Sequence, residues 1–407
     1  MTVRVNKSSF NIREKLSELE RPIGLKGSEL MRSETAQEAR NFVSAGRKNV
    51  LINGSMLIYQ RGASTGVTSV NNYGPDRQYY IITYGTYTIT QQPDAPTGAG
   101  FAFSADIDCT TAESPAAGDS LIHRISPLEG YDSEKFAYGT PEAKTSTVSF
   151  WIKCSYADSF TLAIIDHDNQ RSCFKSFSIN QADTWEYKTL TFPGDTSGNG
   201  ADNNNTLGLG LDLIIGGGTD WRGSSAPEGV WNTRSNNQDS YLTKNSTSFG
   251  TSTSHTMNIT GVQWEFGHNA TEFEHRSYGE ELALCQRYYL KYGMDDLYGI
   301  EAAYSSTGVE NLHASTAIAT GAMVDSDDAI LTMHLPVMMR ARPSVNIVDS
   351  RISNGATYYN NATVIQNNNS SRAMFSALVD NGGTMTAGQG AVLSIKGNGY
   401  IELDAEL

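Results

Sequence analysis

The sequence predicts a mainly β protein with a short α-helical N-terminal arm, a central β-sandwich, a linking helix and a C-terminal β-sandwich. Apolar and polar residues alternate along many short segments, as they do in strands with one buried face. Glycine is abundant, with 38 residues, and only 18% of the residues are charged, which favours short strands and many turns. With 407 residues the chain is long enough for two or three domains.

Residues 1–48 form the predicted arm, because they combine helix signals with 10 of the 30 lysines and arginines. Asn11 with Glu14 and Thr35 with Glu38 can each cap a short helix. Helices this short are marginal in water without an apolar partner. The arm can pack on its own domain or dock into another protein, and docking is the prediction. The residues expected to anchor it are Ile12, Leu16, Leu19, Phe42 and Val43.

Residues 49–277 have the pattern of a β-sandwich. Val148, Phe150 and Ile152 would share one strand face, because strand side chains alternate. Many such strands at regular spacing, joined by polar turns, are typical of a sandwich. The strands expected here are 147–153, 160–165, 172–179, 185–192 and 207–215.

The turn 166–169 contains oxygen ligands that could hold a cation, namely Asp166, Asp168 and Asn169. The spacing lacks the glycine and the distal glutamate of an EF-hand, and a hairpin connection explains these residues better. No metal site and no cofactor are therefore predicted.

The central unit is expected to end in the strand that carries Val262, Trp264 and Phe266 on one face. Glu265 lies on the opposite face of that strand, where a solvated carboxylate is expected.

A linking helix is predicted over 278–297. Ser277 with Glu280 fits a capping box at its start, and Gly293 can end it. Apolar residues at helical spacing follow the cap: Leu282, Cys285 and Tyr289.

Residues 298–407 form the predicted second sandwich, with no solenoid repeat, heptads or collagen triplets, so a compact shape is expected. In the last strand one face is apolar: Ile401, Leu403, Ala405 and Leu407. The strands expected in this unit are 299–304, 330–335, 344–348, 363–366, 373–379, 391–396 and 400–407.

Four segments resemble bacteriophage tail-fibre and related virion proteins. GVQWEFG followed by TEFEHRSYGEELALCQRYY resembles the domain junction of that family, and GRKNVLINGSMLIYQRG resembles the entry to its β-jelly-roll. STVSFWIKCSYADSFTLAIIDHDNQRS resembles its central strands, and the closing YIELDAEL resembles its end. The resemblance implies a jelly roll similar to carbohydrate-binding modules over 49–277, a virion-proximal N-terminal arm and a homotrimer.

The charge balance argues against nucleic-acid binding. The formal net charge is −14, whereas binding to phosphate needs clustered lysine and arginine. No apolar run approaches the ~20 residues that span a bilayer, so no membrane insertion is expected. The four cysteines lack metal-ligand spacing and are expected to be reduced core thiols, as in a protein assembled in a bacterial cytoplasm. They are Cys109, Cys154, Cys173 and Cys285.

The segment 216–253 has the composition of a glycan-binding loop, because aromatic rings stack on sugar C–H faces while polar groups bind hydroxyls. A second long irregular segment is 193–206. The alternative is that both tryptophans fold back to fix the loop or fill a subunit interface. The candidate carbohydrate-binding residues are Trp221, Arg222, Trp231, Arg234 and Tyr241.

No catalytic residues are predicted. Glu272, Glu274 and His275 cluster at the joint, but a role in orienting the two domains explains them better. No hydrolase, metalloprotease, nucleotide-binding or redox motif occurs. The resembling family's depolymerases carry a long parallel β-helix, and its repeat is absent.

The leading hypothesis is a non-enzymatic structural component of a tailed bacteriophage virion, most like a short tail fibre. Its partners would be other virion proteins through the arm, further copies of itself, and host cell-surface glycan. Several linked copies would strengthen weak sugar binding. The alternatives are a capsid decoration, head-fibre or tail-collar protein with a purely structural role, and a glycan depolymerase.

Overall fold

The computed structural model describes most of the chain after the arm. The described residues are 47–68, 72–222, 227–234, 248–293, 315–353, 358–360, 363–366, 371–380 and 385–407. The predicted strand 299–304, Tyr241 and the anchor residues Ile12, Leu16, Leu19, Phe42 and Val43 lie outside them.

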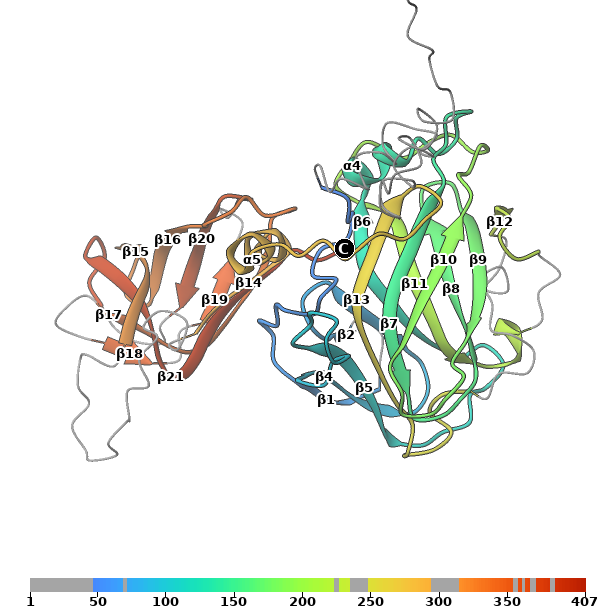
Figure 1. The fold of residues 1–407 in the computed structure, drawn as a ribbon. Coiled ribbons are helices and arrows are strands. Elements are labelled where there is room, and N and C mark those ends of the chain that lie inside the picture. The colour runs from blue at the N-terminus through green and yellow to red at the C-terminus, as the bar shows by residue number, and fades with distance from the viewer. Residues whose placement is uncertain are drawn as a thin grey trace, which may run out of the picture.

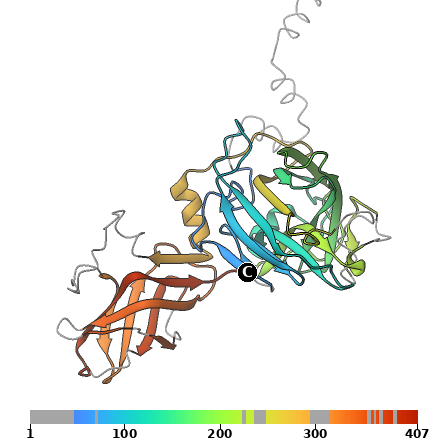
Figure 2. The same ribbon diagram turned by 90° about the horizontal axis from the view of Figure 1, so that it is seen from below.

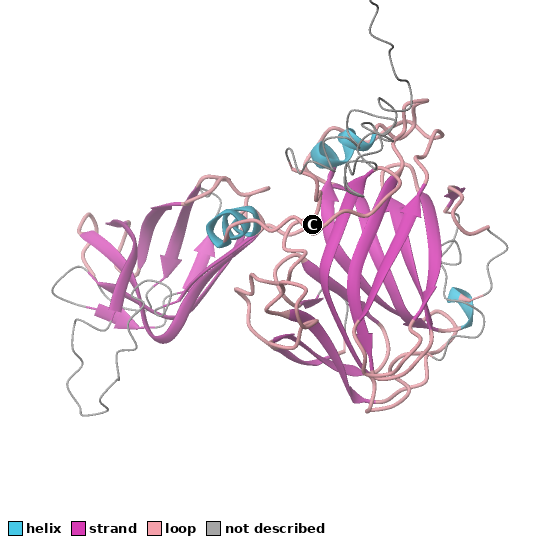
Figure 3. Cartoon of the chain, viewed as in Figure 1, coloured by secondary structure: helices cyan, strands magenta, loops and turns pink. Residues whose placement is uncertain are grey.

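The first β domain consists of two antiparallel sheets that pack face to face, which confirms the predicted mainly β jelly-roll class (Figures 1 and 3). In order, the six-stranded sheet contains β1 (Ser64–Val67), β4 (Thr86–Gln92), β5 (Ser104–Thr111), β13 (Thr256–Phe266), β7 (Ser146–Cys154) and β10 (Glu186–Phe192). The seven-stranded sheet contains β12 (Asn232–Thr233), β9 (Arg171–Ser178), β8 (Ser159–Asp166), β11 (Leu207–Gly217), β6 (Ser120–Glu129), β3 (Gln78–Ile82) and β2 (Asn72–Tyr73).

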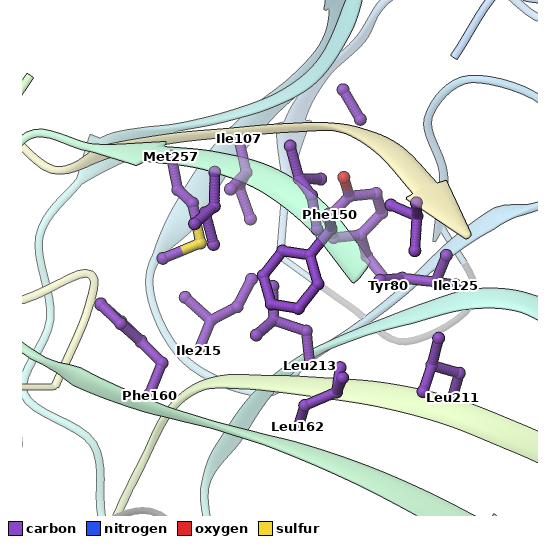
Figure 4. Close-up of a cluster of buried hydrophobic side chains, with 14 of the residues drawn as sticks. Tyr80, Ile107, Ile125, Phe150, Phe160, Leu162, Leu211, Leu213, Ile215 and Met257 are labelled. Carbon is purple, nitrogen blue, oxygen red and sulfur yellow. The ribbon is translucent and has the colours of Figure 1, made fainter. Parts of the chain in front are cut away.

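The core of this domain lies between the two sheets (Figure 4). Alternation places Phe150 of β7 and Leu213 of β11 inside, both fully buried. Short helical turns, α4 (Gly130–Ser133), η1 (Glu134–Phe136) and η2 (Thr219–Trp221), lie in the connections. All four cysteines are buried and free, as the composition predicts.

The predicted hairpin connection between β8 and β9 is confirmed. The Asn169 backbone N–H donates to Asp166 Oδ1 at 3.0 Å, and the Asn169 side chain donates to Asp166 Oδ2 at 3.0 Å. These bonds satisfy the Asp166 carboxylate within the turn.

The linking helix is shorter than predicted. Helix α5 (Tyr278–Gln286) begins after Ser277, which has extended N-cap geometry, but the Ser277 side chain makes no capping hydrogen bond. The helix ends at Gln286, and β14 (Tyr289–Gly293) follows it and pairs with the last strand. The expected helix to residue 297 was wrong, because Leu290 is fully buried in the second domain's core as a strand residue.

The second β domain is one eight-stranded antiparallel sheet (Figure 2). Its apolar side chains form a separate core. Its last strand is continuous where two segments were predicted, and β15 was not predicted at all. Besides β14, the strands in sheet order are β18 (Tyr358–Asn360), β17 (Ser344–Ser353), β21 (Gly390–Asp404), β15 (Ser315–Met323), β16 (Asp328–His334), β20 (Met374–Asp380) and β19 (Thr363–Gln366).

Buried charged side chains join the two domains. Glu129 of the first domain is fully buried and accepts hydrogen bonds from Arg287 at 2.8 and 2.7 Å and from the Tyr288 hydroxyl at 2.6 Å. Burial alone would raise the pKa of Glu129, but these hydrogen bonds hold it below its ordinary value. Arg340 donates to the carbonyl oxygens of Asn205 and Ala405 at 2.6 and 2.7 Å. The two domains are therefore joined by an interface with specific hydrogen bonds and ion pairs, in addition to the chain connection.

No helix among the described residues is long and apolar enough to cross a membrane.

One buried histidine makes the stability of the first domain depend on pH. His123 is 1% exposed, stacks on Tyr80 at 4.3 Å and hydrogen-bonds Gln78 Oε1 at 2.9 Å. Burial lowers the pKa of His123 to about 3, against about 6.5 in an unfolded chain. The unfolded state therefore binds the extra proton between these values, and stability falls as the pH drops below about 6.5.

We expect this histidine to contribute a slope of up to about 1.4 kcal/mol per pH unit between pH 6 and pH 4. Urea unfolding across that range measures it, and the slope should decrease by that amount in a His123→Gln variant. The exposed His268, replaced by Gln, controls for the loss of a histidine. Equal slopes in the wild type and His123→Gln would contradict the prediction.

Candidate functional site

The outer face of the seven-stranded sheet carries a buried ion pair. Arg124 of β6 and Asp212 of β11 are directly opposite in the register, and both side chains point away from the core that Ile125 and Leu213 fill. Arg124 Nε and Nη2 donate to the two Asp212 oxygens at 2.8 and 2.9 Å. Burial would raise the pKa of Asp212, but Arg124 holds it below its ordinary value.

A cavity of about 200 Å³ lies over this pair. Trp221 covers part of it: its side chain packs on Ile122 and Ile214 and is only 5% exposed. Trp221 Nε1 donates to the Gly118 carbonyl oxygen at 3.1 Å, which fixes the indole in place. The lining residues are Ile81, Ser120, Ile122, Arg124, Ile165, Asp212, Ile214, Trp221 and Arg234.

Three polar side chains pack closely around Gly210 beside the ion pair. A Cβ on this residue would lie 3.0 Å from His167 Nε2, 3.1 Å from Arg124 Nε and 3.2 Å from Asp212 Oδ1. Burial, and then the positive charge of Arg124, lower the pKa of His167 to about 3, so the ring is neutral at pH 7. A larger residue than glycine would therefore push these three side chains apart.

A second, more open pocket of about 340 Å³ forms where the two long irregular segments meet. Trp231 forms one wall, and its Nε1 donates to the Pro193 carbonyl oxygen at 2.7 Å. Val230, which is 47% exposed, lies beside it. The pocket also includes the ion pair of Arg171 and Asp195, whose Nη2–Oδ1 distance is 3.0 Å.

Three of the five candidate carbohydrate-binding residues lie at these two places. Trp221 and Arg234 line the cavity, whereas Trp231 lines the open pocket. Arg222 binds the Gly217 carbonyl oxygen at 3.3 Å and also Ser248 Oγ, so it braces the base of the loop. Tyr241 lies outside the described residues. Trp221 thus takes the alternative arrangement, in which the ring folds back onto the sheet.

The polar residues of the cavity come largely from strands and, apart from Arg234, were not predicted from the loop composition. Asp212 interrupts the apolar pattern of β11 and faces away from Leu211 and Leu213. That alternation marks Asp212 as an outward residue. Its pairing with Arg124, 88 residues away, depends on the sheet register.

The charged side chains between β13 and α5 hold distant segments of the chain together. Glu274 Oε2 accepts hydrogen bonds from the backbone N–H groups of Lys48 and Asn49 at 2.6 and 2.7 Å. Arg276 donates to the carbonyl oxygens of Leu51 and Asn49 at 2.9 and 2.6 Å. His275 packs against the ring of Phe101 at 5.4 Å. Glu274 and Arg276 therefore fix the segment that enters the sandwich against the segment that leaves it.

Glu265 was expected to be solvated, and this was wrong. It is only 1% exposed, because residues after the strand turn back over it. Its carboxylate accepts hydrogen bonds from the Thr271 N–H at 2.8 Å, the Thr271 hydroxyl at 2.7 Å and Gln263 Nε2 at 2.8 Å.

No family model and no curated protein matches the chain. Among solved structures, the enzymatically active domain of tailspike protein 4 from bacteriophage CBA120 aligns at 10% identity and a TM-score of 0.26, over 54% of this chain and 21% of that one. A candidate sugar-binding protein from Bacteroides thetaiotaomicron aligns at 13% identity and a TM-score of 0.29, over 54% of this chain and 100% of that one. The tandem CBM22 domain of Paenibacillus barcinonensis Xyn10C aligns at 8% identity and a TM-score of 0.25, over 89% of this chain and 91% of that one. With TM-scores below 0.5, these likenesses carry no argument about function.

Proposed function

We propose that the chain is a non-enzymatic structural component of a tailed-phage virion, a short tail fibre that attaches to glycan on the host surface. The observation that carries the proposal is the open pocket beside Trp231. The resemblance of four sequence segments to virion proteins supplies the context. The N-terminal arm attaches the chain to other virion proteins, which assemble in the host cytoplasm, and a homotrimer presents several pockets together.

The pocket beside Trp231 has the chemistry that weak sugar binding requires. An indole offers a flat apolar face for sugar C–H groups. Arg171 and Asp195 offer a donor and an acceptor in a fixed pair, since they bind each other through both carboxylate oxygens. Thr196 and Ser197 add hydroxyl groups. A few fixed polar groups around an aromatic wall are typical of small-ligand sites.

The proposal includes no catalysis, because the acids near the pocket are engaged in structure. Asp195 is 2% exposed and paired with Arg171, so its carboxylate is held in that ion pair. Hydrolysis of a glycosidic bond uses two carboxyl groups about 5–10 Å apart across the bond. Among the residues that line this pocket, Asp195 is the one acid.

We expect the full chain to bind bacterial surface polysaccharides on a glycan array and a Trp231→Ala variant to lose at least about tenfold in affinity. An aromatic residue at the centre of a contact often carries about 2 kcal/mol, or about thirtyfold in affinity, so tenfold is the lower bound. Binding by the labelled protein, followed by titration of the best glycan, measures the effect.

The matched control is Trp185→Ala. Trp185 is also half-buried, and its Nε1 likewise donates to a single oxygen, Asp94 Oδ1 at 3.2 Å. It does not line the pocket. A blank array, or equal losses in both variants, would count against attachment through Trp231. Release of reducing ends from a polysaccharide would refute the non-enzymatic part.

A further inference from the structure

We infer that the cavity beneath Trp221 binds the carboxylate-bearing ring of an acidic sugar, such as a uronate or a sialate. The inference rests on the proposed glycan attachment and names the class of sugar that the jelly roll selects. The cavity is a separate place from the open pocket, since Arg124, Asp212 and Arg234 line the cavity alone.

The charges of the cavity favour an anion. Arg124 and Arg234 both line it, and among the lining residues Asp212 is the one acid. Asp212 is already bound by Arg124 in a two-bond pair. One positive charge, formally that of Arg234, is therefore in excess. This contrasts with the net charge of −14 for the whole chain. A planar guanidinium matches the two oxygens of a carboxylate, so a carboxylate fits the cavity better than a single-atom anion.

A buried polar atom beside the ion pair lacks a partner. His167 Nε2 is buried and has no hydrogen-bond partner among the described residues. Buried polar atoms usually have one, so an unpaired atom calls for an explanation. Nε2 packs closely around Gly210 together with two atoms of cavity-lining residues, Arg124 Nε and Asp212 Oδ1. A sugar hydroxyl that reaches Nε2 from the cavity would pair with the neutral imidazole without adding charge.

The size of the cavity selects one ring. An apolar protein cavity of about 150 Å³ holds benzene, so about 200 Å³ accepts a single six-membered ring. The walls around the ion pair are apolar, with Ile122, Ile214 and Trp221 packed together. They would face the C–H groups of a sugar ring, while Arg234 would face its carboxylate. A longer oligosaccharide would have to continue outside the cavity.

Titration of the full chain with single sugars tests the inference. The ligands are glucuronate and N-acetylneuraminate, with glucose and N-acetylglucosamine as neutral counterparts. We expect each acid to bind at least about tenfold more tightly than its neutral counterpart, since a charge-assisted hydrogen bond is worth more than a neutral one. Calorimetry or ligand-observed NMR measures the difference. Equal binding of acids and neutral sugars would overturn the inference.

Two variants locate the site. Arg234→Gln removes the excess charge and should lower affinity for glucuronate about tenfold or more, without changing affinity for glucose. Gly210→Ala should weaken binding of both, because its methyl group would crowd Arg124 and Asp212, which line the cavity. Lys135→Gln, which removes an exposed charge elsewhere, should leave every affinity unchanged. Undiminished binding of glucuronate by Arg234→Gln or by Gly210→Ala would place the acid elsewhere and refute the assignment.

The glycan array tests host attachment and the titrations test the carboxylate site, and either result can be negative without the other. A blank array, together with glucuronate binding that Arg234→Gln weakens, would refute host attachment and leave a carboxylate site. Array binding that Trp231→Ala abolishes, with no preference for acids, would support attachment and refute the carboxylate site.

Discussion

Replacing Arg77 by Met is expected to destabilise the protein by about 3–5 kcal/mol, which is the usual cost of leaving one buried charge without its partner. Arg77 is fully buried at the domain interface. Its guanidinium binds Glu406 and the Pro127 carbonyl oxygen, and it lies 3.5 Å from the centre of the Tyr288 ring. Glu406 is itself 4% exposed, so water cannot replace the lost arginine. Urea unfolding at pH 7 measures the change.

A double variant separates the cost of leaving a charge unpaired from the cost of losing the packing of the arginine side chain. Glu406 keeps Arg61 at 3.4 Å in Arg77→Met, whereas Glu406→Gln alone leaves both arginines without this carboxylate and should cost at least as much. Adding Glu406→Gln to Arg77→Met should recover about 1–3 kcal/mol, since the unpaired charge is removed. Lys291→Met is the matched control, because Lys291 and Glu402 lie 3.9 Å apart and are each more than a fifth exposed. Such a pair contributes about 0–1 kcal/mol. A loss in Arg77→Met no larger than that in the control would contradict a buried pair.

The interface bears on function because the second domain would be carried as a fixed extension of the jelly roll. Glu129 and Arg287 bind across it through two hydrogen bonds, and Arg340 reaches carbonyl oxygens of both domains. If Arg77→Met separates the domains without affecting sugar binding, the sites act within the first domain alone. If binding is lost as well, the second domain shapes the sites.

Many of the strands from β7 onward were predictable, because strand periodicity is local, whereas β1 to β6 were not predicted individually. Leu207, Leu209, Leu211 and Leu213 alternate with small or polar residues, and β11 lies over Leu207–Gly217. The linking helix, which was predicted to extend too far, shows the limit of local periodicity. Tyr289 continues the helical spacing of Leu282 and Cys285, but the same residue also suits a strand. The decisive contact is the pairing of Leu290 with Leu403, which is more than 100 residues away.

The candidate site was predictable only in part, because composition does not report exposure. Trp221 and Trp231 belong to the same polar loop and have the same local signal. The structure buries Trp221 on Ile122 and Ile214, whereas Trp231 lines an open pocket. That difference depends on the sheet below the loop. No sequence pattern indicated a role for Arg124, because that role depends on a partner in another strand.

Replacing Trp264 by Ala is expected to destabilise the first domain by about 3–5 kcal/mol, the usual cost of removing a large aromatic side chain from a core. Trp264 is fully buried in β13, and its ring centre lies 4.7 Å from that of Phe136. Its Nε1 donates to Ser146 Oγ at 2.9 Å. The alanine would leave a cavity between β13 and the turn after α4, and it would leave the buried Ser146 hydroxyl without this donor.

Trp264→Phe separates these two costs, because it keeps most of the ring volume and loses only the donor. We expect it to cost about 1–3 kcal/mol, less than the alanine variant. Trp185→Ala is the matched control for removing an indole, since Trp185 is half-exposed at the edge of the same sheet, and it should cost well under half as much. Urea unfolding followed by circular dichroism compares the three variants. If Trp264→Ala cost no more than Trp185→Ala, the ring would not be part of the core. The segment GVQWEFG would then mark the junction for a reason other than packing.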